Sequence, residues 1–272
     1  MKKLFILLFI LLFILTLTSF SYAEDVRING NLVVGTKGTI SGLCPVYVDA
    51  NTITLGSGYL EANGKSYDLS SATNFDIDVF DNGGFTYGYI DDGTAVAPTI
   101  TLDWSATEPA WSDSLQGWYN GNDRCIISLY CDGAATIGGF TSVEIGKLVS
   151  INWAFGFQLA SDMNPNSGWQ TPDVAESSTK LPINAMAGYF FIFGNDSDGC
   201  IYVACDNYEL ASINTTPIGV PYWAQLYIVG DHGSVGASGK VMLGASRNVR
   251  LAGDNDSDNA MDLNITGYEY GR

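Results

Sequence analysis

The sequence contains a single histidine, His232, so a metal site built from several imidazoles is excluded. Any Ser-His-Asp triad would depend on that one residue, and no GxSxG-like elbow accompanies it. Phosphate-loop and dinucleotide-binding glycine motifs are also missing. The segment Gly230-Asp231-His232-Gly233 is typical of a surface turn. The sequence therefore predicts a protein that is not an enzyme.

Basic residues are scarce as well, with 12 Lys and Arg against 29 Asp and Glu and a net charge of −17. Such an acidic chain repels nucleic acid and anionic membranes, which argues against both as partners. Residues that favour helices are few, whereas Gly, Thr, Ser, Asn, Val, Ile and the aromatics are abundant. This composition builds turns and strands, so the expected fold class is all-β.

Cysteines are few, odd in number and without CxxC spacing, which removes support for a structural zinc site. Cys125 and Cys131 are expected on the same side of one strand, about 20 Å apart, too far to bond each other. Cys200 and Cys205 could close only across a tight turn. Buried free thiols, Cys44 included, are the alternative.

The first residues follow the pattern of a secretory signal sequence. Lys2 and Lys3 precede an apolar run from Leu4 to Leu15, and Ser21-Tyr22-Ala23 ends in small residues suited to cleavage. We expect residues 1–23 to be removed and the protein to be secreted or exposed at the cell surface. An uncleaved anchor is the alternative, although the run is shorter than the ~20 residues of a membrane span. No later segment is apolar enough to cross a bilayer.

Residues 24–43 form a short glycine-rich segment in which Asn29-Gly30 and three further glycines separate small apolar pieces. Such pieces rarely bury a face alone, so stacking against copies in other subunits is one expectation. A simple N-terminal hairpin is the other. We treat this segment as a β assembly element preceding the main domains.

Residues 44–131 alternate polar and apolar positions between short turns, which predicts an antiparallel meander. Asn63-Gly64 predicts a tight hairpin, and Phe75 to Val79 alternates with its aspartates facing water. Trp111 and Trp118 lie in segments, 108–111 and 117–120, that we expect to be ordered loops.

Residues 132–272 contain a long apolar strand pair over 143–159, a polar loop over 162–180 and further strand-like segments. These segments are Met186–Phe193, Cys200–Cys205, Tyr222–Val229, Val241–Ala245, Val249–Ala252 and Met261–Tyr270. Their number and spacing predict a β-sandwich or jelly-roll-like domain.

Several short sequence segments within residues 45–130 occur in a recognisable order. They are Val48 to Leu55, Leu60 to Leu69, Tyr87 to Asp92, Thr107 to Trp111 and Gly117 to Ile126. This order resembles a module common in bacteriophage tail fibres and related virion structural proteins, and residues 265–272 resemble their last strand. The resemblance implies a β-rich, often trimeric architecture that attaches to surface glycans.

The signal sequence departs from the tail-fibre pattern, because virion proteins assemble inside the host cell. It favours an exported cellular protein built on a fibre-like module, such as an adhesin or appendage. We therefore expect a secreted, non-enzymatic structural or adhesive protein that self-associates. The alternative is a secreted β-sandwich that binds or cleaves carbohydrate.

Large aromatic side chains are the candidates for sugar contacts, because flat rings stack on the apolar faces of pyranoses. The candidate residues are Trp104, Trp111, Trp118, Tyr119 and Trp169. The competing interpretation is that these rings anchor the core or its loops.

Alternating acidic side chains predict a hard-cation loop, for which calcium is the candidate ion. Its ligands would be Asp254, Asp256, Asp258 and Asp262. The loop lacks the glycine at position six and the glutamate at position twelve of an EF-hand, and Asn195 to Gly199 is a shorter version. A solvated turn is the alternative, since Asp and Asn bond their own backbone.

A glycosidase would need two carboxyl groups about 5–9.5 Å apart in a cleft, one with its pKa raised by burial. Glu108, Asp113 and Asp123 lie in the aromatic-rich region and are the candidates. Their separation cannot be read from the sequence, so this alternative stays open.

Overall fold

The computed structural model describes residues 27–28, 31–32, 40–62, 65–90, 99–133, 135–145, 148–163, 180–205, 226–244, 247–253 and 260–272. Every element in these residues is a β-strand, and the strand ladders are antiparallel. The all-β prediction is confirmed. The described part of the chain has no helix with the length and apolar character needed to span a membrane.

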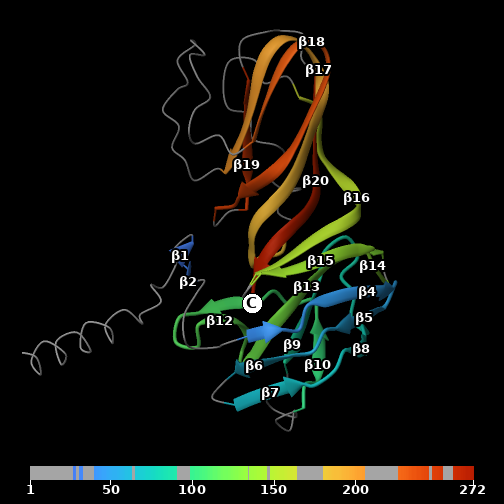
Figure 1. Ribbon diagram of the computed structural model, residues 1–272, viewed down its shortest axis with the longest axis vertical. Coiled ribbons are helices and arrows are strands. Elements are labelled where there is room, and N and C mark those ends of the chain that lie inside the picture. The colour runs from blue at the N-terminus through green and yellow to red at the C-terminus, as the bar shows by residue number, and fades with distance from the viewer. Residues whose placement is uncertain are drawn as a thin grey trace, which may run out of the picture.

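Two three-stranded sheets form part of the base of the molecule (Figure 1). One has the order β3 (Ile40–Gly42), β6 (Gly58–Ala62), β7 (Lys65–Leu69), and the other β4 (Pro45–Asp49), β5 (Thr52–Leu55), β8 (Thr73–Asp76). Ile53 and Leu55 are buried on one face of β5, as their alternation predicts. The strand expected to reach Val79 ends at Asp76, although Ile77 is still buried.

A third sheet completes the base. Its order is β10 (Leu102–Ser105), β9 (Phe85–Ile90), β13 (Asp123–Gly133), β12 (Gly117–Asn120) and β11 (Ala110–Ser112), with β14 (Thr136–Ile137) paired to β13. β13 lies between β9 and β12, so the strand order departs from a simple meander. The expected domain boundary after residue 131 falls inside β13.

The segments expected as ordered loops, 108–111 and 117–120, instead contribute the hairpin β11–β12. Trp111 and Trp118 are directly opposite each other in this hairpin, with ring centroids 5.7 Å apart and an interplanar angle of 71°. Edge-to-face aromatic pairs stabilise paired strands, and this cross-strand contact explains why a strand pair forms here.

A fourth sheet rises from the base along the long axis of the molecule (Figure 1). Its order is β15 (Phe140–Ile145), β16 (Leu148–Met163), β20 (Ala260–Gly271), β17 (Ala185–Cys205) and β18 (Leu226–Met242), with β19 (Val249–Gly253) paired to β17. The strand pair expected over 143–159 is present as β15–β16. The strands described after residue 139 join one sheet, so a self-contained sandwich or jelly roll in residues 132–272 is not confirmed.

The turn expected at Asn195 to Gly199 is wrong, because these residues continue the ladder of β17. Asp196 pairs with Gly233 and Asp198 with Asp231 of β18. His232 consequently lies within a strand and not in a turn. The ladder satisfies the backbone groups that a turn would otherwise leave to water, which explains how so polar a segment remains extended.

The N-terminal segment contributes the short hairpin β1 (Arg27–Ile28) and β2 (Asn31–Leu32). The signal sequence, residues 1–23, lies outside the described residues and stays a prediction. Stacking of the glycine-rich segment between subunits likewise stays a prediction.

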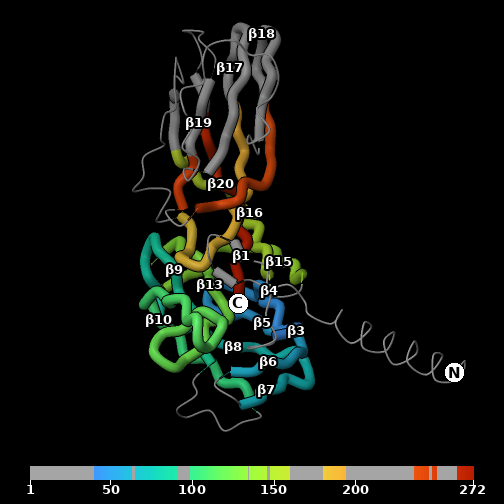
Figure 2. Tube along the Cα trace, turned by 90° about the vertical axis from the view of Figure 1, so that its left-hand side faces the viewer, coloured from blue at the N-terminus to red at the C-terminus, as the bar shows by residue number. Residues whose placement is uncertain are grey.

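The rising sheet and the third sheet share one aromatic core. Tyr268 of β20 is fully buried and meets Phe85 of β9 edge to face at 5.7 Å and Trp153 of β16 at 5.3 Å. Its hydroxyl donates a hydrogen bond to the Ser128 carbonyl of β13. Figure 2 shows β9 and β13 beside the lower ends of β16 and β20. These contacts make the two expected domains pack on a common core.

Two buried arginines connect the ends of the described chain. Arg272 Nη2 lies 2.9 Å from Glu144 Oε1, and its Nη1 donates to the Gly42 carbonyl. Arg124 Nη2 donates to the carbonyl oxygen of Arg272 and Nη1 to that of Glu61. A buried charge is costly unless it is paired and hydrogen-bonded. Glu144 pairs with Arg272, whereas the bonds of Arg124 go to backbone carbonyls.

Three described cysteines are free thiols: Cys44, Cys125 and Cys131, the last two buried. Cys125 and Cys131 do not bond each other, as predicted. A β-bulge between Cys125 and Ile127 interrupts the alternation on which the same-side prediction rested. Cys200 and Cys205 lie in β17, not on either side of a turn.

Buried tyrosines and thiols are expected to make the fold sensitive to alkali. Burial raises the pKa of Tyr87 and Tyr268 above the usual 10.0, and that of Cys125 from 9.0 to about 12. Because the unfolded chain releases these protons first, stability is fully present below pH ~9 and falls as the pH rises further.

The check is denaturant unfolding at a series of pH values, with tyrosinate absorbance followed in parallel. We expect the denaturant concentration at the unfolding midpoint to decrease as the pH is raised from ~9 to ~11. The buried tyrosines should ionise only when the chain unfolds. Complete tyrosine ionisation near pH 10 in a chain that stays folded would contradict the burial of these groups.

Candidate functional site

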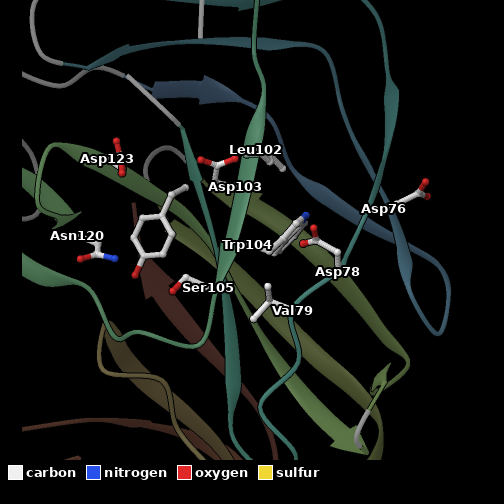
Figure 3. A pocket seen from close by; sticks show the side chains of 10 residues that line it. Asp76, Asp78, Val79, Leu102, Asp103, Trp104, Ser105, Asn120 and Asp123 are labelled. Carbon is white, nitrogen blue, oxygen red and sulfur yellow. The ribbon is translucent and has the colours of Figure 1, made fainter. Parts of the chain in front are cut away.

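An open pocket of about 470 Å³ lies on the base, where the end of β8 approaches β9, β10, β12 and β13. Its wall contains aromatic, acidic and amide side chains (Figure 3). The lining residues are Asp76, Asp78, Val79, Tyr89, Leu102, Asp103, Trp104, Ser105, Asn120 and Asp123.

Trp104 is held in the wall of the pocket by close backbone packing. A Cβ on Gly88, the residue opposite it in β9, would come within 3.1 Å of the Trp104 ring, so the glycine allows the ring to lie against the sheet. Trp104 is 8 % exposed, and its indole nitrogen is not among the buried polar atoms that lack a hydrogen-bond partner. In Figure 3 the nitrogen end of the ring is directed toward Asp78.

Four aspartates surround the pocket, and none of its lining residues is Lys, Arg or His. Asp76, Asp78 and Asp103 are exposed, and Asp76 accepts a hydrogen bond from the Thr52 hydroxyl at 3.2 Å. In the described part of the chain, no three His, Cys, Asp or Glu side chains are gathered as a metal-holding group. The lining of the pocket is therefore acidic.

Tyr89 forms a neutral part of the wall. Its hydroxyl donates a 2.6 Å hydrogen bond to the Thr107 carbonyl, which ties β9 to the segment after β10. Burial, with a smaller contribution from Cys125, raises the pKa of Tyr89 above its usual value of 10.0. The phenol therefore stays protonated at neutral pH and serves to shape the pocket.

The structure separates the aromatic residues proposed as sugar contacts. Trp104 lines the pocket, whereas Trp111 and Trp118 pair with each other on the β11–β12 hairpin. Tyr119 is buried under Arg124, whose guanidinium carbon lies 5.9 Å from the centre of its ring. Trp169 lies outside the described residues.

The acidic residues proposed for a glycosidase also lie in different parts of the structure. Asp123 lines the pocket, Glu108 lies 3.9 Å from Arg247, and Asp113 accepts a hydrogen bond from the Trp111 indole at 2.9 Å. Of the proposed calcium ligands, Asp262 lies in β20. The remaining ligands, Asp254, Asp256 and Asp258, lie outside the described residues, so calcium binding there stays a prediction.

Sequence reasoning missed most of the residues that line the pocket. Asp76 and Asp78 alternate with apolar residues, and that pattern correctly placed them facing water. It gave no sign that Asp103 and Asn120, which follow in other strands, would share a pocket with them. Pairing of β10 with β9 and of β12 with β13 brings these positions together.

A second surface feature lies where the edge strands β4 and β15 adjoin. The Ser142 hydroxyl donates to the Pro45 carbonyl across this junction. Four large apolar side chains remain exposed there, a set that we name the apolar row: Val46 53 %, Val48 46 %, Val143 55 % and Ile145 67 %. Large apolar side chains exposed on two adjoining strands are candidates for an interaction surface.

Comparisons with known proteins leave the site to be interpreted from its own chemistry. No protein-family model matches the sequence, and a search of curated proteins finds no match either. The tail-fibre resemblance of residues 45–130 therefore stays a prediction.

Proposed function

We propose that this chain is a secreted, non-enzymatic adhesive protein that binds a surface glycan in the pocket beside Trp104. The observation that carries the proposal is an open pocket of about 470 Å³ whose wall combines the Trp104 ring with carboxylate and amide side chains. Carboxylate and amide oxygens around it accept hydroxyl protons, and the indole N–H donates to a ring or hydroxyl oxygen. Specific pockets combine an apolar wall with a few such polar groups.

Binding fits the pocket better than hydrolysis. A general acid in a glycosidase needs its pKa raised by burial, and Asp76, Asp78 and Asp103 are exposed to water. Of the three carboxylates proposed for a glycosidase, only Asp123 lines the pocket, and Glu108 and Asp113 do not. The same exposed carboxylates remain well suited to accepting hydrogen bonds from sugar hydroxyls.

Trp104→Phe is expected to weaken glycan binding about fivefold, because it removes one donor while keeping an aromatic ring in the wall. A glycan array identifies the ligand, and calorimetry with the full chain measures the change. Trp118→Phe, on the β11–β12 hairpin, is the matched control and should bind as the unmodified chain does. Equal binding by Trp104→Phe, or an array without hits, would count against this site.

Self-association is a second component of the proposal, and the apolar row is the feature that favours it. A second copy presents an identical row, so pairing across a two-fold axis covers the same four side chains on each copy. Glu144 lies between Val143 and Ile145 in the sequence, and each chain carries a net charge of −17. Salt screens the repulsion between two acidic copies, so association should strengthen as salt is added.

Ile145→Asp is expected to shift the protein toward monomer, since each copy would place a charge in an apolar contact. Light scattering of the full chain at low and high salt gives the mass, and Ser66→Asp at an exposed position of β7 is the control. A monomeric unmodified chain at micromolar concentration would remove this component and leave glycan binding untouched.

A further inference from the structure

We propose that Asn264 of β20 carries an N-linked glycan whose first sugar lies against the ring of Phe191. Residues 264–266 read Asn-Ile-Thr, the acceptor triplet Asn-x-Ser/Thr in which the middle residue is not proline. Such a glycan is attached only to an exported chain, so this inference rests on the secretion that the proposed function includes. It does not involve the Trp104 pocket.

The sheet places the side chain of Asn264 on the face that carries no core residues. Its neighbours Leu263 and Ile265 are 0 % exposed and belong to the core. Successive side chains of a strand point to opposite faces, so Asn264 points away from that core, and it is partly exposed. We name this side of the rising sheet the outer face. Three further triplets begin at residues whose side chains are not described: Asn195, Asn214 and Asn255.

The outer face has room for a bulky substituent beside Asn264. Gly156 of β16 is exposed, and a Cβ added to it would lie 4.0 Å from the Asn264 Cβ. Because this glycine has no side chain, it leaves the space next to the acceptor open. Gln158, which pairs with Asn264 from β16, is exposed as well. A glycan can therefore leave the surface here without displacing a packed side chain.

Phe191 supplies the independent observation, because a large ring that is 37 % exposed lies next to the acceptor. Phe191 of β17 pairs directly with Asn264 of β20, so their side chains share the outer face. The ring is parallel to that of Phe193 within 16°, at a centroid distance of 6.4 Å. A Cβ added to Gly236 would come within 3.3 Å of the Phe191 ring, so this glycine allows the ring to lie over β18.

A sugar attached to Asn264 would start within reach of this ring. Directly opposite residues of paired strands have Cβ atoms about 5 Å apart. The carbon–hydrogen face of a pyranose can lie on the exposed aromatic surface, which removes apolar area of both from water. The glycan therefore accounts for an aromatic ring that would otherwise remain exposed on the sheet.

The transfer step is balanced by a sugar donor that the export pathway supplies as a glycosyl diphosphate. The amide nitrogen of Asn264 forms a bond to the anomeric carbon, and the bond from that carbon to the diphosphate oxygen breaks. The diphosphate leaves with the electron pair of that bond, and the amide gives up one proton. No oxidant or reductant is consumed.

Attachment has to precede folding of the rising sheet. β20 pairs with β16 on one side and with β17 on the other, and the Thr266 hydroxyl donates to the Tyr189 carbonyl at 3.2 Å. A transferase that reads the triplet needs this hydroxyl and the Asn264 amide together, outside a ladder. The nascent chain offers both, whereas the completed sheet does not.

Mass spectrometry of peptides from the full chain, recovered outside its own producing cells, tests the modification. We expect the peptide with Asn264 to carry the mass of a glycan. Asn264→Gln and Thr266→Val should each abolish that mass, and Thr266→Ser, which keeps the hydroxyl, should retain it. Asn152→Gln is the matched control: Asn152 is exposed on β16, and the residue two positions later is Ala154. Peptide masses do not depend on the fold of a variant.

Thermal unfolding tests the contact with Phe191. The glycosylated chain should have a Tm about 2 °C above that of Asn264→Gln, since the sugar covers apolar surface only in the folded state. In the Phe191→Ala background this difference should disappear.

The outcomes separate the inference from the proposed function. A secreted chain that lacks residues 1–23 and has an unglycosylated Asn264 would overturn the inference and leave the Trp104 pocket untouched. A chain retained in the cell with residues 1–23 attached would remove secretion and the inference together. A glycan at Asn264 whose effect on the Tm is the same with Phe191→Ala would overturn the contact with the ring.

Discussion

Tyr268→Ala is expected to lower the free energy of unfolding by about 4 kcal/mol, the largest effect that the structure predicts for a single side chain. Tyr268 is fully buried, meets Phe85 edge to face and Trp153 in a tilted arrangement, and donates its hydroxyl proton to the Ser128 carbonyl. The substitution leaves a cavity and an unpaired buried carbonyl at the contact between β20 and the third sheet. Equilibrium denaturation with urea measures the loss.

The matched control for this variant is Phe193→Ala on the same rising sheet, where the ring is 46 % exposed. It should change the free energy of unfolding by less than about 1 kcal/mol. Because the two expected domains share the core around Tyr268, near- and far-ultraviolet circular dichroism should follow one transition. Two separated transitions, with Tyr268→Ala affecting only one, would contradict the shared core.

Glu144→Ala is expected to destabilise the fold by about 3 kcal/mol, because it leaves the charge of Arg272 buried without its carboxylate. The Arg272 side chain is 0 % exposed, and Glu144 Oε1 accepts both from its guanidinium at 2.9 Å and from the Gly42 N–H at 2.8 Å. One carboxylate therefore links β15, the residue after β20 and the end of β3.

Thermal and urea unfolding of Glu144→Ala measure this effect, with Asp68→Ala as a control that removes an exposed carboxylate. The double variant Glu144→Ala/Arg272→Met should recover part of the loss, since it also removes the unpaired charge. A Glu144→Ala protein as stable as the control would show that solvent satisfies Arg272 and that the linkage is weak.

Local sequence patterns predicted the strands well wherever one face is buried against the core. The alternation of Ile53 and Leu55 and the apolar segment that follows Val143 both matched the structure, because burial of every second side chain leaves a period-two signal. The patterns failed where pairing with a distant strand decides the outcome. Asn195 to Gly199 contains turn residues, yet the ladder from β18 holds it extended.

The residues of the candidate site were likewise predicted in part from the sequence and in part only from the structure. An aromatic pool that included Trp104 was evident from the sequence, as was the outward orientation of Asp76 and Asp78. The choice of Trp104 over Trp111 and Trp118 required the sheet order, because only β10 brings its tryptophan beside the end of β8.

By itself the sequence determined the all-β class, the acidic character and most strand positions, because these depend on composition and on the two-residue period of side chains. Tertiary structure alone decided which strands share a sheet, the common core around Tyr268 and the gathering of four aspartates near Trp104. The physical reason is that these features depend on contacts between residues far apart in the chain, and such contacts leave no local periodicity.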